Sequence, residues 1–251
     1  FVSFFFFFNI FIPSVVNYII PATIMSFFIS NKVPEGDGKK VQILPGGKVI
    51  AILGILTIAI TVTGHQALHM PPVFGMMFGL GLLGTYGYFL KVKSTEKNKF
   101  DIFQLTGKAE WDTLLFFYGI LVAVGGLAAL GYLKLISDDM YVTLGPTYAN
   151  ILVGFLSAII DNIPIVYAVL TAHPSMDMGQ WLLITLTAGV GGSLLSIGSA
   201  AGVALMGQAR GIYTFFAHLK WSWAILLGYA ASVATHLWLN SHLFDLVPLS
   251  K

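Results

Sequence analysis

The sequence predicts an all-α integral membrane protein, a helical bundle that contains a re-entrant hairpin and a broken helix. Three observations lead to this fold class. Of the 251 residues, 57% are hydrophobic and only 10% are charged, whereas a soluble domain carries about 25% charged residues. The apolar residues form long continuous runs, and two of these runs are interrupted near the middle by polar or small residues. A water-soluble core does not need so much apolar surface, so lipid is the expected solvent.

Charge and cysteine content exclude several other classes of protein. The net charge is +2 and most lysines lie in two loops, so there is no basic face of the kind that binds nucleic acid. The chain has no cysteine, which excludes disulfides and thiol ligands. It opens with Phe1 inside an apolar run, without the pattern of a signal peptide, and is therefore expected to be N-terminally truncated.

Seven apolar segments approach or exceed the roughly 20 residues of a membrane-spanning helix. They are 1–29, 48–64, 72–90, 113–136, 147–172, 180–207 and 221–243. A transmembrane β-barrel would need polar residues at every second position. These runs are continuously apolar instead, which favours helices.

Lysines orient the first helices. The loops before 48–64 and after 72–90 are rich in lysine, whereas the loop at 65–71 has neither Lys nor Arg. The excess of positive charge in cytoplasmic loops places the two lysine-rich loops in the cytoplasm. If every later segment crossed, the uncharged loop 173–179 would be cytoplasmic and the loop with Arg210 and Lys220 would be outside. A single re-entrant segment, either 113–136 or 147–172, removes this conflict.

Segment 147–172 is the better candidate for the re-entrant hairpin. It contains Asp161-Asn162-Ile163-Pro164 near its middle. Pro164 cannot donate to a helical ladder and disfavours a helical Ile163, while Asp and Asn offer competing local hydrogen bonds. Irregular backbone at membrane depth survives only inside protein or beside a water-filled cavity. This segment is therefore expected to be buried.

Segment 180–207 is predicted to be a broken helix. Its stretch from Gly189 to Gly202 is too small and polar to face lipid, and half-helices broken near the membrane centre commonly form transport sites. Ser193, Ser196 and Ser199 recur every third residue, which would bring their hydroxyls near one face of a helix. They could supply oxygen ligands, or they could simply allow close helix packing.

Asp161 is the strongest functional candidate, because carboxylates within membrane segments usually mark ion or proton pathways. Asn162 adds an amide oxygen, a ligand type that hard cations accept. Ser157 lies one turn earlier and could be a ligand or a packing residue. Glu110, Asp112 and Thr113 open segment 113–136; they could cap that helix, where acidic residues suit the helix dipole, or line a cation entry.

Three apparent motifs carry no chemistry. The G-x-G-x-x-G match at Gly79–Gly84 lies inside an apolar run with no preceding strand, so it indicates helix packing, as does the Gly75-x-x-x-Gly79 spacing. His65 and His69 lack the Glu that a zinc protease needs after the first His.

Two paired motifs resemble a known family. They are the Ser157-to-Pro164 stretch and the run from Gly191 to Gly202, supported by Glu110-Trp-Asp112-Thr113 and by Gly207-Gln-Ala-Arg210. Together they look like NhaD-type sodium/proton antiporters of the ion transporter superfamily, from about residue 47 onward. Family members are longer and contain two inverted repeats, so the resemblance implies that this chain is the C-terminal half, one repeat of an inverted-repeat transporter.

The resemblance implies two functional parts of the chain and a mechanism. Residues 1–136 would be scaffold-like helices, and 137–251 would be the transport-site unit with the hairpin, the broken helix and a final helix. The family's ion-handling positions match Asp161, Asn162, Ser157, Ser196, Ser199, Glu110, Asp112 and Thr113, with Na⁺ held by Asp161, Asn162, Ser196 and Ser199. Asp161 would bind Na⁺ or a proton, but not both at once.

The expected setting follows from the same reading. The protein would lie in the cell (inner) membrane, need no cofactor besides the transported Na⁺ and H⁺, and act without nucleic acid. Its partners would be the lipid bilayer and the missing N-terminal repeat, with a homodimer as a further option. The nearest rival is a related permease for arsenite or a carboxylate such as citrate, which would want cationic or amide-rich tips. More distant rivals are an intramembrane enzyme, which lacks a second membrane aspartate here, and a subunit of a proton pump.

Overall fold

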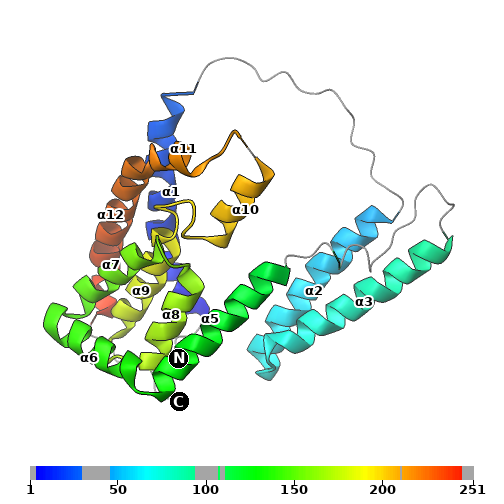
Figure 1. Ribbon diagram of the computed structural model, residues 1–251, viewed down its shortest axis with the longest axis horizontal. Coiled ribbons are helices and arrows are strands. Elements are labelled where there is room, and N and C mark those ends of the chain that lie inside the picture. The colour runs from blue at the N-terminus through cyan, green and yellow to red at the C-terminus, as the bar shows by residue number, and fades with distance from the viewer. Residues whose placement is uncertain (1–3, 30–45, 94–106, 108–110, 210, 245–251) are drawn as a thin grey trace. The chain divides into compact units, whose positions relative to one another are not determined.

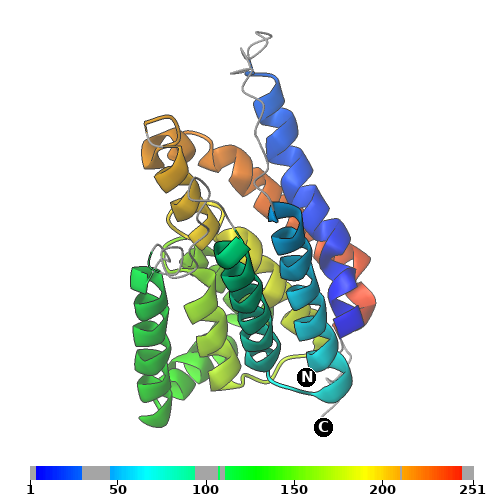
Figure 2. The ribbon, with the colours of Figure 1, turned by 90° about the vertical axis from the view of Figure 1, so that its right-hand side faces the viewer.

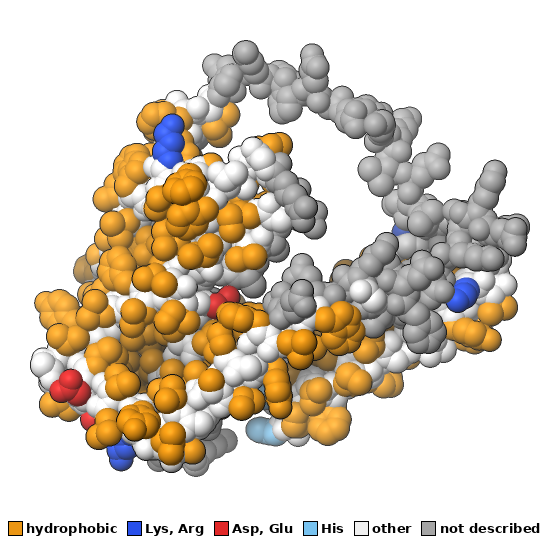
Figure 3. Space-filling view, in the orientation of Figure 1, with side chains coloured by type: hydrophobic (Ala, Val, Ile, Leu, Met, Phe, Trp, Pro, Cys, Tyr) orange, Lys and Arg blue, Asp and Glu red, His pale blue; other side chains and the backbone are white. Residues whose placement is uncertain are grey.

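The structure is a computed structural model, which describes residues 4–29, 46–93, 107, 111–209 and 211–244. Within these ranges the regular secondary structure is helical throughout. The chain divides into two compact units, one formed by Val33–Asp112 and the other by Phe1–Lys32 together with Thr113–Lys251. Hydrophobic side chains cover most of the face seen in Figure 3. Because such side chains need an apolar solvent, the surface confirms the membrane fold class.

The smaller unit is a helical hairpin of α2 (Gly47–Leu68) and α3 (Pro72–Lys93). A Cβ atom on Gly75 would lie 2.6 Å from the Cα of Thr61, and one on Gly79 would collide with the side chain of Thr57. Glycine is therefore required where the two helices approach most closely. The interpretation of the Gly75-x-x-x-Gly79 spacing as helix packing is confirmed.

In the larger unit, α1 (Phe11–Ser26), which follows the short helix η1 (Phe4–Ile10), runs beside α12 (Ser222–Leu239) (Figure 2). Gly228 of α12 permits this approach, since a Cβ there would lie 2.7 Å from the carbonyl oxygen of Asn17. Segment 221–243 thus becomes α12 and the short helix η3 (Ser241–Leu243).

Four described helices are long and apolar enough to cross a membrane, or five with a bent pair counted as one span. The four are Phe6–Ser26, Gly47–Leu68, Pro72–Lys93 and Ser222–Leu239. The bent pair is formed by α5 (Trp111–Ala129) and α6 (Tyr132–Leu144), with an angle of 78° between them.

The bent pair corrects the predicted segment 113–136. Its helix ends at Ala129, and Gly131 takes a left-handed conformation with a φ of 82° before α6 begins. Only glycine adopts this conformation without steric cost. Residues 132–136 are mostly apolar and appeared to continue the span, but they belong to a helix that also carries Lys134, Asp138 and Asp139.

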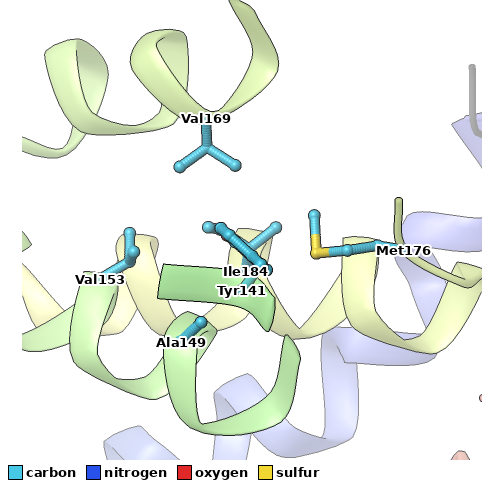
Figure 4. Close-up of a cluster of buried hydrophobic side chains, with 6 residues drawn as sticks. All are labelled: Tyr141, Ala149, Val153, Val169, Met176 and Ile184. Carbon is cyan, nitrogen blue, oxygen red and sulfur yellow. The ribbon is translucent and has the colours of Figure 1, made fainter. Parts of the chain in front are cut away.

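Segment 147–172 forms two helices joined by a non-helical turn, as predicted, and its arms are α7 (Pro146–Ser157) and α8 (Asn162–Ala172). Its re-entry into the membrane from one side stays a prediction. Ala149 and Val153 of α7 share a hydrophobic cluster with Val169 of α8 and with Met176, which follows α8 (Figure 4). The start of α7 and the end of α8 therefore lie at the same end of the hairpin. We call residues 158–161 the tip.

The predicted broken helix is also confirmed. Its halves are α9 (Met178–Gly191) and α10 (Ala200–Gln208), separated by residues 192–199, which we call the break. After α10 the chain continues through α11 (Phe215–Leu219) into α12 (Figure 1). Helix α9 is the most buried of these elements and packs against both α7 and α12. The division into a scaffold part and a transport part stays a prediction.

Candidate functional site

The tip of the hairpin is built around Asp161. Helix α7 ends at Ser157, and Asp161 caps the N-terminus of α8, with its Oδ1 accepting a hydrogen bond from the Ile163 amide at 3.0 Å. Pro164 is the third residue of α8, within the first turn, where a missing N–H leaves no helical hydrogen bond unmade. Asn162 is the first residue of α8, and both it and Asp161 are half-buried.

The three serines of the break do not lie on one face of a helix, as their spacing suggested. The backbone leaves the helix at Gly192, because a run of glycine and serine offers turns that compete with the ladder. Ser193 Oγ then donates to the Val190 carbonyl at 2.6 Å, while Ser199 Oγ caps α10 by accepting from the Gly202 amide at 3.1 Å. Ser196 is 1% exposed, and its hydroxyl has no hydrogen-bond partner among the residues that the structure describes.

The tip of the hairpin lies directly against the break. A Cβ on Gly198 would lie 2.5 Å from the carbonyl oxygen of Ala158 and 2.7 Å from that of Gly192. Ser157 is fully buried, and its hydroxyl donates to the Ala188 carbonyl at 2.8 Å. The predicted residue Ser157 is therefore brought together with the break.

Two side chains that the sequence analysis missed hold the break from the other side. His218 Nε2 donates to the Ser193 carbonyl at 3.0 Å, and Ser222 Oγ donates to the Leu194 carbonyl at 2.6 Å. The Nδ1 atom of His218 accepts from the Tyr213 hydroxyl at 2.6 Å, and burial raises the pKa of Tyr213, which keeps that hydroxyl protonated. No sequence signal singled them out, because the partners are backbone carbonyls distant along the chain.

A second polar cluster lies at the open end of the hairpin, around Asn150 and Gln180. The sequence did contain a signal for this cluster. Asn150 and Gln180 are amide side chains inside apolar segments. Because uncompensated polar groups are costly within a membrane, such residues are expected to find partners.

The structure does not test the remaining predicted residues, Glu110, Asp112 and Thr113. Glu110 lies outside the described residues. Asp112 and Thr113 stand in the first turn of α5, and the division between the two compact units falls between them. Their roles stay a prediction.

The chemistry available at the tip and break is that of oxygen ligands. The C-terminal ends of α7 and α9 bring backbone carbonyl oxygens there, and Asp161, Asn162 and the serines add carboxylate, amide and hydroxyl oxygens. Over the part of the chain that the structure describes, no group of three or more His, Cys, Asp or Glu could hold a metal ion. Among the described residues of the tip and break, Asp161 supplies a carboxylate and the other side-chain oxygens are neutral.

The chain is similar in sequence to several known proteins. Residues 1–189 match the family described as Citrate transporter. The chain is 54% identical to the Na(+)/H(+) antiporter NhaD of Alkalimonas amylolytica, in an alignment that covers 94% of this chain and 54% of that protein. It is 49% identical to NhaD of Vibrio cholerae, over 97% of this chain and 56% of that protein.

A plant protein is more distantly similar: sodium/proton antiporter 1 of Arabidopsis thaliana is 33% identical, over 95% of this chain and 43% of that protein. The chain spans about half the length of the curated relatives it matches. No solved structure matches. The apolar spans and these relatives make it a multi-pass membrane protein, and the resemblance to the NhaD type is confirmed. Since the family match covers residues 1–189, the chain belongs to the citrate transporter family of membrane proteins.

Proposed function

We propose that this protein exchanges Na⁺ for protons across the cell membrane, with Asp161 as the group that binds one or the other. The names of the relatives support sodium/proton antiport. The single observation that carries the assignment of the site is the contact between the hairpin tip and the break, at Ala158 and Gly198.

The tip suits reversible cation binding. Asp161 uses Oδ1 to cap α8, and its carboxylate has a second oxygen that a cation could take. The hydroxyl of Ser196 is buried without a partner, which costs free energy unless a ligand satisfies it. A Na⁺ ion close to that hydroxyl would restore the missing interaction.

Competition at one carboxylate gives exchange. An ionised Asp161 attracts Na⁺, whereas a protonated one is neutral and has lost most of its attraction for the cation. If the tip and break face the two sides of the membrane in turn, Na⁺ leaves on one side as a proton replaces it. In this proposal the fold holds the oxygen ligands of the tip and of the break next to one another.

Transport of a carboxylate such as citrate is the second candidate, because the family match carries that description. The N-termini of α8 and α10 lie at the tip and break and would favour an anion. Asp161, however, places a carboxylate at the same position, and two like charges repel. The tip therefore favours a cation.

The test is the Na⁺-induced change of pH inside inverted membrane vesicles that contain the protein. Asp161→Asn keeps the size of the side chain and an oxygen that can cap α8, but removes the charge and the titrating proton. We expect it to abolish exchange while the protein still accumulates in the membrane. Exchange at the wild-type rate in Asp161→Asn would refute the assignment, and uptake of labelled citrate without any Na⁺-induced pH change would favour the second candidate.

A further inference from the structure

Five polar or polarisable side chains meet at the open end of the hairpin, away from the tip. Asn150 is fully buried at their centre. Its Oδ1 accepts from the Tyr141 hydroxyl at 2.8 Å, and its Nδ2 donates to Gln180 Oε1 at 3.0 Å and to the Gln180 carbonyl at 3.1 Å. Met176 Sδ lies 3.4 Å from the same nitrogen, and Gln180 Nε2 donates to Thr147 Oγ1 at 2.6 Å. We call Tyr141, Thr147, Asn150, Met176 and Gln180 the base network.

The base network joins both ends of the hairpin to α9. Thr147 and Asn150 lie in the first turns of α7, and Met176 follows the end of α8. Gln180 lies in the first turn of α9, which continues to the break. The chain that enters the hairpin is therefore bonded to α9, whose other end borders the break, and the chain that leaves the hairpin joins the network through the contact of Met176 with Asn150.

The two arms of the hairpin are held unequally. Helix α7 has three further bonds to its neighbours: Thr187 Oγ1 donates to the Asn150 carbonyl at 2.8 Å, Tyr229 to the Ile151 carbonyl at 2.9 Å, and Ser157 to Ala188. In the described part of α8 the side-chain hydrogen bonds are local, such as Thr171 to the Tyr167 carbonyl. Helix α8, which follows Asp161, is thus held by packing, and the base network reaches it only through Met176, beyond its C-terminal end.

We propose that Asn150 is the positioning residue of this transporter, which fixes through the base network where the tip with Asp161 lies against the break. This inference rests on the proposed exchange of Na⁺ and H⁺ at the tip. Residues 150–157 span about 10 Å of helix at 1.5 Å per residue. A tilt of about 10° at the base would then move the tip by about 2 Å, whereas a working site must be held to about 0.5 Å. A small change at the base is therefore large at the tip.

The base network needs an amide at position 150. Asn both accepts from Tyr141 and donates to the carbonyl of Gln180. An ionised Asp accepts but cannot donate, so it would face the Gln180 carbonyl with a negative charge. A protonated Asp again has one acceptor and one donor. Asn150→Asp should consequently restore the network only when its carboxyl is protonated.

The experiment measures exchange in inverted vesicles for wild type, Asn150→Ala, Asn150→Asp and the control Thr171→Val. Misplacement by about 1 Å can reduce the rate by about 100-fold, so Asn150→Ala is expected to raise the apparent KM for Na⁺ by at least about tenfold. Relative to wild type at each pH, Asn150→Asp should exchange well at low pH and fall by at least about tenfold as pH rises. Thr171→Val removes only a local bond and should stay within about twofold of wild type.

A second readout does not depend on transport. The chain has no cysteine, so Ile160→Cys places a single thiol at the tip, and its rate of reaction with a maleimide reports the position of the tip. Asn150→Ala should change this rate, and Asn150→Asp should change it only at high pH. An Asn150→Ala variant with wild-type KM and wild-type labelling overturns the proposal, as does a constant ratio of Asn150→Asp to wild type at all pH values. Absence of Na⁺-induced exchange in the wild type would refute the proposed function, while the labelling still tests the base network.

Discussion

The closest approach of α7 and α9 provides a sharp test of the packing. A Cβ on Gly191 would lie 2.7 Å from the carbonyl carbon of Gly154, and closer still to its oxygen, whereas ordinary contacts are 3.4–4 Å. Both partners are backbone, so no side chain can move aside. Gly191→Ala must push the two helices apart by about 1 Å, which forfeits a large part of the dispersion energy along their contact.

The cost can be worked out from this geometry. Overpacking costs about 1–3 kcal/mol. The separation would also stretch the bond from Ser157 Oγ to the Ala188 carbonyl, now 2.8 Å, beyond hydrogen-bond range at a further cost of about 1 kcal/mol. The higher helix propensity of alanine offsets at most about 1 kcal/mol of this cost. The net loss in the free energy of unfolding should be about 1–3 kcal/mol.

The assay is unfolding of the purified protein in detergent, followed by circular dichroism as denaturant is added. Gly189→Ala is the matched control, because it lies in the same helix and a Cβ there would have nothing within 4 Å. It should be neutral or stabilising by up to about 1 kcal/mol. Equal stability of the Gly191→Ala and Gly189→Ala variants would refute the tight helix contact.

Three more predictions concern the break and the topology. Ser196→Ala removes a buried hydroxyl that has no partner, so stability should not fall, while the apparent KM for Na⁺ should rise about tenfold if the hydroxyl is a ligand; an unchanged KM would make Ser196 a packing residue. Ser199→Ala removes the cap of α10 and should lower its local stability by about 1 kcal/mol, seen as faster amide hydrogen exchange in 202–207. A cysteine in place of Ser175 should react with an impermeant maleimide only from the non-cytoplasmic side, and labelling only from the cytoplasm would show that the predicted orientation is wrong.

The sequence alone determined the elements whose cause is local. Long apolar runs require lipid, so the spans at 1–29, 48–64, 72–90 and 221–243 could be predicted within a few residues. Asp161 and Pro164 interrupt an apolar run by their own chemistry, and this made the hairpin predictable. The small and polar residues of Gly189–Gly202 interrupt the next apolar run in the same way, and this made the broken helix predictable.

The sequence could not determine how distant residues combine, because that depends on which backbone atoms come within reach after folding. Spacing placed Ser193, Ser196 and Ser199 on one helical face, but the backbone unwinds there and gives each a different environment. The bend after α5 was hidden because the apolar run continued beyond Gly131. Only the tertiary structure brought Asn150 to Gln180, His218 to Ser193 and Ala158 to Gly198, since each of these contacts depends on the packing of helices far apart in the chain.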